Sequence, residues 1–260
     1  IEQLVLTDIQ RVFALAKDHE VSFIEMAGKK AQKDNEKNIP DNPSLSYTLN
    51  NLLSSVVLES HSGKKDFWEP LDTPGATPFV LSPLGQQRFL DHLARVKAYF
   101  GYKGAFIVRS TNNFPHSSGL ASSASSFAAL TKCAVLALSE LSNKPLLSVE
   151  EQARLSRLGS GSSCRSFFSP WALWEEETVQ AIDLPYTDLI HQVIVISHDE
   201  KPVPSSEAHV RVKSSSHYTT RCQRATENLK VLRHALETQD WPSAYQICWR
   251  EFQDMHQLFT

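Results

Sequence analysis

The stretch at residues 105–138 limits the possible folds of this 260-residue chain more than any other. Residues 105–108 form a short apolar run typical of a strand, and Pro115 marks a turn soon after it. Residues 112–130 then read NNFPHSSGLASSASSFAAL, and apolar residues continue at helical spacing to Leu138. A strand, a Ser- and Gly-rich turn and a long apolar helix follow one another, which favours a fold that packs helices on a sheet.

Strand and helix patterns alternate along the rest of the chain. Strands are expected in residues 44–59, which contain SLSYTL and SSVVLE, and in the apolar run at 192–197. Further helices are expected at residues 4–16, 84–100, 149–158, 218–236 and 241–259. The fold class is therefore α/β or α+β. The sequence LPYTD interrupts the pattern near residues 185–190 and divides the chain into domains 1–187 and 188–260.

Composition narrows the possible functions. With 26 basic and 29 acidic residues the formal net charge is −3, so bulk binding of nucleic acid or of an anionic membrane is not expected, and an anion site would be local. No apolar run reaches about 18 residues, so no membrane span is expected. Residues 1–30 carry no signal-peptide pattern. Four cysteines without metal or disulfide spacing are expected to be reduced thiols of a cytoplasmic protein.

The Ser- and Gly-rich turn has the layout of an anion site. The first turn of a helix presents unpaired N–H groups and a partial positive charge, both of which suit phosphate. Gly119 lets the backbone approach a ligand closely, and the neighbouring serines add hydroxyl donors. The alternative is an ordinary helix cap, with small residues where two helices pack closely. The stretch contains neither a Walker A loop nor a G-x-G-x-x-G fingerprint.

A second cluster of small residues lies downstream. Residues 159–166 read GSGSSCRS, so two glycines and three serines precede Arg165. A guanidinium is charged at any physiological pH and suits bidentate binding of carboxylate or phosphate. The alternative is a flexible loop with an incidental surface arginine. Two such clusters in a chain of nearly neutral net charge favour a polyanionic ligand.

Four segments together resemble one family. NNFPHSSGLASSASSFAAL resembles the phosphate-binding motif of the galactokinase–homoserine kinase–mevalonate kinase superfamily, in the form N-N-F-P-x-x-x-G-L-A-S-S-A of mevalonate diphosphate decarboxylases. GSGSSCRS resembles the G-S-G-S-A-C-R-S segment of that family, NIPDNPSLSYTL its N-L-P-x-N-x-S-L-S-x-T-L segment, and REFQDMHQLF its helix with D-M-H-x-L-F. The matches keep their order from about residue 28 to residue 260. The resemblance implies an N-terminal ribosomal-protein-S5-like domain and a C-terminal α/β domain.

The resemblance also implies an activity. Members of the family use ATP and Mg²⁺ to convert mevalonate 5-diphosphate to isopentenyl diphosphate, with release of ADP, phosphate and CO₂. The expected partners are therefore these small molecules, with no nucleic acid and no membrane. A homodimer and a cytoplasmic location are expected from the same resemblance.

Particular residues carry over by their positions in the motifs. Lys29, Ser160 and Arg165 would act in catalysis, with Arg165 on the substrate carboxylate or diphosphate. The substrate-binding residues would be Lys29, Ser160, Ser162, Arg165 and Ser206. The residues around the ATP phosphates would be Ser117, Ser118, Gly119, Leu120, Ala121, Ser122 and Ser123. Ser122 would also bind Mg²⁺.

The chain departs from the family pattern in two places. The K-Y-W-G-K segment of the family corresponds to EMAGK here, so Glu25 and Met26 replace a lysine and a tyrosine. The 260 residues contain no D-A-G-P-N-like segment, which in the family carries an aspartate proposed as the base on the 3-hydroxyl. Asp254, in the D-M-H segment, is not its equivalent and is expected to be a surface carboxylate. Two alternatives stay open: a related kinase acting on mevalonate or its phosphates, and an inactive relative that binds nucleotide or diphosphate.

Overall fold

The computed structural model describes residues 5–8, 11–18, 32–34, 37–73, 80–114, 122–187, 189, 215 and 217–259, with most side chains described from residue 37 onward. The chain forms two compact units. Unit 1 comprises residues 1–22 and 49–167, and unit 2 comprises residues 23–48 and 168–260. Each unit is described separately below.

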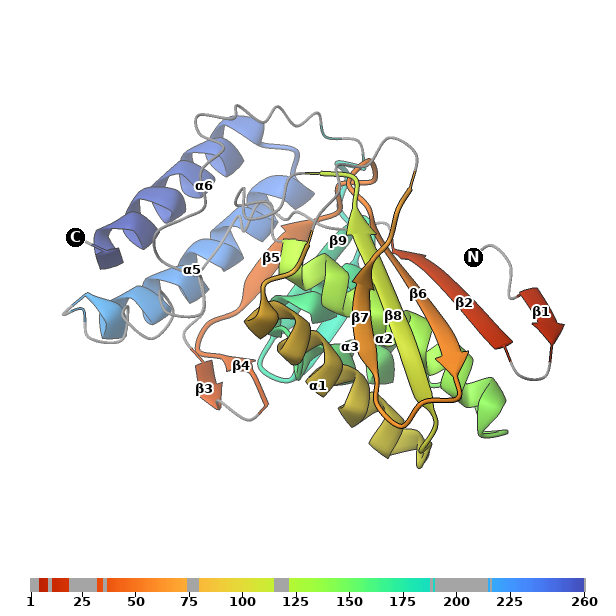
Figure 1. The fold of residues 1–260 in the computed structure, drawn as a ribbon. Helices are drawn as coiled ribbons and strands as arrows, with labels where there is room; N and C mark the ends of the chain where they lie inside the picture. Colours follow the sequence, from red (N-terminus) through yellow and green to blue (C-terminus); the bar gives the residue numbers. More distant parts are fainter. Residues whose placement is uncertain are drawn as a thin grey trace. The chain divides into compact units, whose positions relative to one another are not determined.

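Unit 1 is built on a sheet that is antiparallel except at one edge. Its strand order is β1-β2-β6-β8-β7 (Figure 1). These strands are β1 (Val5–Asp8), β2 (Arg11–Asp18), β6 (Ser54–His61), β8 (Ala105–Asn112) and β7 (Phe67–Pro70). β7 pairs parallel to β8, with Trp68 opposite Val108. A parallel pair requires a long crossover connection, and helix α1 (Pro83–Phe100) lies in that connection.

Helices α1 and α2 (Ser122–Leu141) cover one face of this sheet (Figure 1). α2 packs against β2, β6 and β8, and α1 packs against β7 and α2. The core between them includes Val56, Leu58, Phe89, Leu93, Val96, Phe106, Val108, Phe127, Leu130 and Leu138. α2 is long and apolar enough to cross a membrane by length and composition alone, although it contains no uninterrupted apolar run of about 18 residues. However, 67% of its most apolar 18-residue window is buried inside the structure. α2 is therefore the core helix of unit 1.

Local signals in the sequence set the ends and the buried face of α1. The Ser82 side chain accepts a hydrogen bond from the backbone N–H of Gly85 at 3.2 Å, and Pro83 occupies the start of the helix. Gly101 ends the helix in the left-handed conformation, with φ of 69°, which glycine adopts without steric penalty. The buried side chains of α1 are Phe89, His92, Leu93, Val96 and Phe100.

Unit 2 combines small sheets with two long helices. A three-stranded antiparallel sheet has the order β10-β9-β5, formed by β10 (Thr178–Ile182), β9 (Trp171–Glu175) and β5 (Ser44–Tyr47). β3 (Gln32–Asp34) pairs with β4 (Ile39–Pro40). Helices α5 (Tyr218–Glu237) and α6 (Trp241–His256) pack against each other, and η3 (Gln257–Phe259) follows α6. The mixed strands and helices confirm the predicted α+β fold class.

Most of the predicted elements are present, with one clear error. The helix predicted at residues 4–16 is wrong, because β1 and β2 occupy this region. An apolar pattern of this length does not distinguish a helix from a strand, and β2 pairs with β6 from Phe13 opposite Glu59 to Asp18 opposite Ser54. The predicted strand at 192–197 lies outside the described residues.

The two compact units are not the two segments predicted from the sequence. β5 pairs with β9, so residues before position 49 share a unit with residues after position 167. A division based on chain order alone cannot detect such a long-range pairing. The boundary between 187 and 188 falls beside residues that are not described, and it stays a prediction about the domains.

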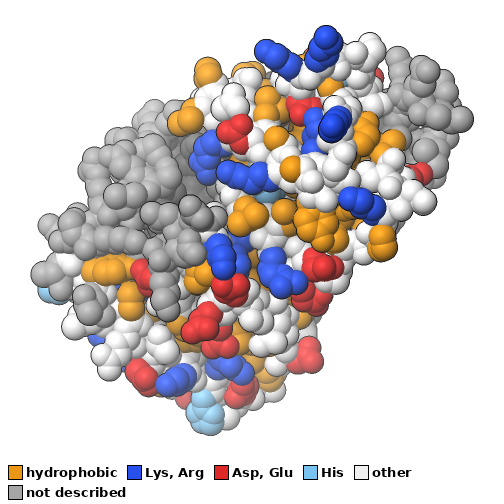
Figure 2. All heavy atoms as spheres, turned by 90° about the horizontal axis from the view of Figure 1, so that it is seen from below, with side chains coloured by type: hydrophobic (Ala, Val, Ile, Leu, Met, Phe, Trp, Pro, Cys, Tyr) orange, Lys and Arg blue, Asp and Glu red, His pale blue; other side chains and the backbone are white. Residues whose placement is uncertain are grey.

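The described surface carries mixed charge. On the face drawn in Figure 2, Lys and Arg side chains are interspersed with Asp and Glu side chains. This agrees with the formal net charge of −3. Anion binding would therefore depend on local features in the polar segments of the two units.

Candidate functional site

Two asparagines at the end of β8 anchor the start of the predicted phosphate loop. Asn112 Oδ1 accepts hydrogen bonds from Ser54 Oγ at 2.6 Å and from Ser126 Oγ at 3.2 Å, which joins β8 to β6 and α2. Asn113 Oδ1 accepts from the backbone N–H of Leu53 at 2.7 Å, and its amide donates to the carbonyl of Asn51 at 2.9 Å. Asn112 and Asn113 therefore fix where the chain leaves the sheet. The motif in the sequence contains both asparagines but does not predict this role.

The other end of the loop is the first turn of α2, which begins at Ser122. Ser122 is buried and Ser123 is exposed. No acidic residue lies in this first turn, so the partial positive charge of the helix terminus is not offset locally. Such a terminus suits an anion. The loop residues Ser117, Ser118, Gly119, Leu120 and Ala121 lie outside the described residues.

The second polar segment follows helix α3 (Val149–Arg157). A capping box starts this helix, because Ser148 Oγ accepts from the N–H of Glu151 while the Glu151 carboxylate accepts from the N–H of Ser148. After α3, the chain turns at Gly159. A Cβ atom on Gly159 would lie 2.2 Å from Phe127 Cδ1 and 2.8 Å from His92 Nδ1. Only glycine fits this close approach between the turn and the helices α1 and α2.

The segment after Gly159 is a short 3₁₀ helix, η1 (Gly161–Phe167), and not the flexible loop that was the alternative interpretation of GSGSSCRS. Ser156 Oγ donates to Ser163 Oγ at 2.5 Å, and Ser163 Oγ donates to the carbonyl of Ser160 at 2.6 Å. The Cys164 thiol donates to the carbonyl of Gly161 at 3.2 Å. These local bonds give an ordered backbone to a stretch whose composition resembles a flexible loop.

Arg165 is fully buried in η1, at 0% exposure. η1 packs against α3 and α2, so the alternative of an incidental surface arginine on a flexible loop is wrong. Ser160 and Ser162, from the same segment, are partly exposed. A guanidinium does not lose its proton on burial, so unit 1 holds a permanent positive charge on an element that contacts α2. The structure therefore brings the two predicted polar segments onto adjacent elements of one unit.

A buried histidine that the sequence analysis missed lies next to these segments. His92 of α1 is fully buried, and its Nε2 lies 2.8 Å from Thr131 Oγ1 of α2. Its ring meets the Phe127 ring edge-to-face, with the ring centroids 5.4 Å apart. Burial, assisted by the nearby charge of Arg95, lowers the pKa of His92 to about 3, so the imidazole is neutral at physiological pH. The position of His92 three residues after Phe89 and four before Val96 was the available signal in the sequence.

Two of the predicted substrate residues lie outside the described part of the chain. These are Lys29 and Ser206, and the departures Glu25 and Met26 lie outside it as well. No group of three His, Cys, Asp or Glu side chains that could hold a metal ion occurs among the described residues. Mg²⁺ in nucleotide sites is commonly held by substrate phosphates and one or two protein oxygens. The hydroxyl of Ser122 at the start of α2 fits that requirement as a single oxygen ligand.

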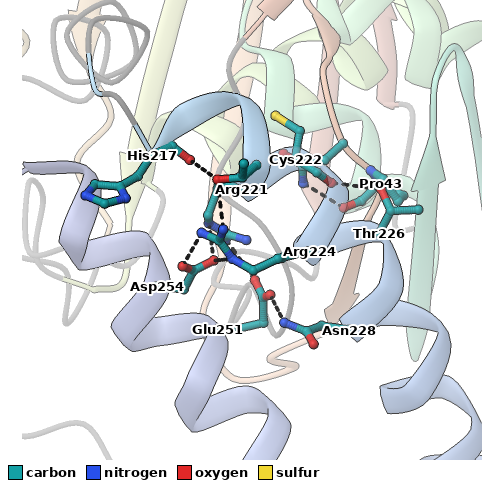
Figure 3. Close-up of polar contacts among 11 residues, drawn as sticks. Pro43, His217, Arg221, Cys222, Arg224, Thr226, Asn228, Glu251 and Asp254 are labelled. Carbon is teal, nitrogen blue, oxygen red and sulfur yellow. Dashed lines mark hydrogen bonds and ion pairs between the residues drawn. The ribbon is translucent and has the colours of Figure 1, made fainter.

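Asp254 belongs to a buried ionic cluster rather than to the surface. Its carboxylate lies 3.3 Å from Arg221 Nε and 2.6 Å from Arg224 Nη2, and its side chain is 13% exposed (Figure 3). Arg221 also pairs with Glu251 at 2.8 Å, and both of these side chains are at most 2% exposed. Asn228 donates to Glu251 at 2.6 Å. The expectation of a surface carboxylate is therefore wrong, and the cluster ties α5 to α6 within unit 2.

Comparison with known proteins gives a consistent result. Residues 19–183 match the family model of the diphosphomevalonate decarboxylase-like N-terminal domain. The diphosphomevalonate decarboxylase mvd1 of Aspergillus fumigatus is 34% identical over 161 residues, which are 56% of this chain and 38% of that protein. The diphosphomevalonate decarboxylase of Candida albicans is 28% identical over 246 residues, which are 86% of this chain and 66% of that protein. The chain thus spans less than two thirds of the length of these curated relatives.

Solved structures extend the comparison to the fold. The crystal structure of a mevalonate diphosphate decarboxylase from Legionella pneumophila is 62% identical, with a TM-score of 0.88 over 95% of this chain and 78% of that chain. A structure of MDDEF in complex with MVAPP, AMPPCP and magnesium is 24% identical, with a TM-score of 0.79 over 95% of this chain and 75% of that chain. At that level of identity the likeness concerns the fold alone. Both comparisons cover 95% of the chain.

Proposed function

The chain belongs to the diphosphomevalonate decarboxylase family, and from this premise we propose that it catalyses the ATP-dependent decarboxylation of mevalonate 5-diphosphate. The products would be isopentenyl diphosphate, ADP, phosphate and CO₂. The relative crystallised with MVAPP, AMPPCP and magnesium binds a substrate, an ATP analogue and the metal ion that this reaction requires. The proposal places the same ligand classes on the present chain.

One observation in unit 1 supports the proposal above the others. The fully buried Arg165 lies on η1, and η1 packs against α2, whose first turn carries no acidic residue. A buried guanidinium keeps its positive charge away from bulk water. A functional reason for keeping it there is to bind an anionic ligand, because a carboxylate or a diphosphate gains most from a positive charge shielded from water. Mevalonate 5-diphosphate carries both anionic groups.

The proposed reaction requires positioning and charge stabilisation more than covalent catalysis. The γ-phosphoryl group of ATP moves to the 3-hydroxyl oxygen of the substrate, and the hydroxyl proton is lost. The C–O bond then breaks and the new phosphate leaves with its electron pair, while the electron pair of the bond to the carboxylate forms the alkene and CO₂ departs. A Mg²⁺ ion bound with ATP would neutralise phosphate charge.

The chain's own residues have separate parts in this scheme. Ser122 and Ser123, together with the loop residues Ser117, Ser118, Gly119, Leu120 and Ala121, would surround the ATP phosphates, and Ser122 would be the oxygen ligand of Mg²⁺. Ser160, Ser162 and Arg165, with Lys29 and Ser206, would bind mevalonate 5-diphosphate. Arg165 would hold the substrate carboxylate or diphosphate in a fixed orientation through its planar guanidinium. The homodimer and the cytoplasmic location stay predictions from the resemblance.

Replacing Arg165 tests this assignment. We expect Arg165→Met, which keeps length but removes charge, to lower kcat/KM for mevalonate 5-diphosphate by at least about a hundredfold. The affinity for ATP, measured separately by calorimetry, should stay within about twofold of the original, since Arg165 is assigned to the other substrate. Arg165→Lys should recover only part of the rate, because an ammonium cannot form the bidentate contact.

A matched control separates this role from a general effect of lost charge. Arg154 lies exposed on the neighbouring helix α3, and Arg154→Met should leave kcat/KM unchanged. Retained ATP binding by Arg165→Met would show that the variant is folded. An Arg165→Met protein with the original rate would exclude the proposed role of Arg165 in substrate binding.

A further inference from the structure

His92 contacts three parts of unit 1 at the turn before the substrate segment, which is the stretch from Ser160 to Arg165. Its ring lies on α1, its Nε2 contacts Thr131 of α2, and its Nδ1 would lie 2.8 Å from a Cβ atom on Gly159. α1 makes a second contact with the same turn, because Arg95 Nη1 donates to the carbonyl of Leu158 at 3.2 Å. The start of the Ser160–Arg165 segment is therefore held from α1 at two successive residues.

The hydrogen bonds determine how the imidazole is protonated and oriented. The Thr131 hydroxyl donates its single proton to the carbonyl of Phe127 at 2.7 Å. It must therefore accept from His92, which places the proton of the neutral ring on Nε2. The Nδ1 atom is then a bare acceptor that faces Gly159. The bond to Thr131 fixes the ring direction, and the contact with the Phe127 ring limits its tilt.

Core packing alone does not explain a histidine at this position. The Nδ1 atom of His92 is buried and has no hydrogen-bond partner among the described residues. A buried polar atom without a partner destabilises the fold, whereas a leucine would fill the space between α1 and α2 without that penalty. The hydrogen bond to Thr131 fixes the direction of the His92 ring, so the ring presents a rigid edge at one defined place. A flexible aliphatic side chain would not be fixed in this way.

We propose that His92 is a positioning residue for the substrate segment: anchored on Thr131, its ring sets the place of Gly159 and thereby aligns Ser160, Ser162 and Arg165 relative to the first turn of α2. The catalytic consequence rests on the proposed function. The alignment itself is a property of unit 1. A misplacement of about 1 Å at a substrate-orienting group can lower a rate by up to about a hundredfold, so a small shift of the turn is sufficient to matter.

Steady-state kinetics of two His92 variants of the full-length protein test the proposal. His92→Leu removes both nitrogens, and we expect the KM for mevalonate 5-diphosphate to rise by about tenfold or more while the KM for ATP changes by less than about twofold. His92→Gln keeps an N–H donor near the position of Nε2 and should bring the KM for mevalonate 5-diphosphate back to within about threefold of the original. A His92→Leu protein with an unchanged KM would overturn the proposal.

Val96→Ala is the control for a merely structural role. Val96 lies on the same helix and is fully buried in the core, whereas the contacts with the turn described above come from His92 and Arg95. This variant loosens α1 by removing buried methyl groups, and it should leave both KM values unchanged at a temperature where the protein stays folded. An equal rise of the KM for mevalonate 5-diphosphate in Val96→Ala would show that any loss of α1 packing has this effect, and it would contradict a specific role of His92.

Hydrogen exchange tests the alignment without any catalytic turnover. The backbone N–H groups of Leu158, Gly159 and Ser160 are hydrogen-bonded within the turn. His92→Leu should raise their exchange rates by about tenfold, and Val96→Ala should not. If the unmodified protein shows no turnover, the proposed function fails, and the exchange rates alone then decide the role of His92. Unchanged exchange in His92→Leu would refute the proposal even in an active enzyme.

Discussion

Three buried polar side chains determine the local geometry of the candidate site in unit 1. Arg165 brings a permanent positive charge into the interior, His92 places a neutral ring against Gly159, and Ser163 links Ser156 to the carbonyl of Ser160. Their common location around η1 indicates that this segment is built for a defined backbone shape rather than for stability alone.

The histidine makes the stability of the protein depend on pH in a defined window. The folded-state pKa of His92, about 3, lies below its ordinary value of 6.5, so only the unfolded chain binds the proton as the pH falls through this range. Stability from the neutral ring is therefore present above about pH 6.5 and is lost progressively toward pH 3, with a limiting slope of about 1.4 kcal/mol per pH unit. His92→Gln should remove this slope. Urea unfolding of both proteins at pH 7 and pH 5 measures the difference, and an identical pH dependence would contradict a buried neutral His92.

The site residues could be predicted from the sequence only where a motif carries them. GSGSSCRS identified Ser160 and Arg165, but the order of η1 depends on hydroxyl contacts that composition does not reveal. The close approach of His92 to Gly159 was not predictable, because the two residues are far apart in the sequence and meet only where the helices pack together. Asn112 and Asn113 were visible in the motif, but their role depends on the pairing of β8 with β6.

The helix pair α5–α6 is held by a buried ionic cluster rather than by apolar packing alone. Arg221 lies between the carboxylates of Glu251 and Asp254, and Asn228 binds the second oxygen of Glu251. Amphipathic patterns predicted both helices, with the start of each correct and the ends within one residue for α5 and three residues for α6. Asp254 was expected at the surface, because a carboxylate is normally exposed unless a cation is buried with it. The pairing across the two helices was not readable from one sequence.

Breaking this cluster should destabilise unit 2 strongly. Glu251→Gln leaves the charge of Arg221 buried with Asp254 as its remaining carboxylate, and we expect a loss of about 3 kcal/mol in the free energy of unfolding. The control is Glu227→Gln, which breaks the exposed pair with Lys230 at 3.2 Å on the same helix α5 and should change stability by less than about 0.5 kcal/mol. Urea unfolding followed by tryptophan fluorescence measures both. Equal effects of the two substitutions would contradict a structural role for the buried cluster.

At the element level the fold was predictable where local signals are strong. Ser82, Pro83 and Gly101 mark the ends of α1, and Ser148 with Glu151 marks the start of α3. The strand structure of β2 follows instead from its pairing with β6, and that of β1 from its pairing with β2. The division into discontinuous units has the same origin, since the pairing of β5 with β9 joins segments that are far apart in the chain.

For the whole molecule, family membership and the buried charge in unit 1 point to the same chemistry. The family model covers residues 19–183 and the Legionella pneumophila structure covers 95% of the chain. The decarboxylase, the related kinase and the inactive binder would all have this fold and would all bind a phosphorylated ligand. They differ in the products released, because only the decarboxylase breaks a carbon–carbon bond.

Product stoichiometry is therefore the most direct test of the central claim. The full-length protein would be supplied with mevalonate 5-diphosphate labelled in its carboxyl carbon, together with ATP and Mg²⁺, and ADP and labelled CO₂ would be followed together. The account predicts equal amounts of ADP and CO₂, both dependent on mevalonate 5-diphosphate. ADP without CO₂ would identify a kinase, the absence of both would identify an inactive binder, and either result would contradict the proposed decarboxylation.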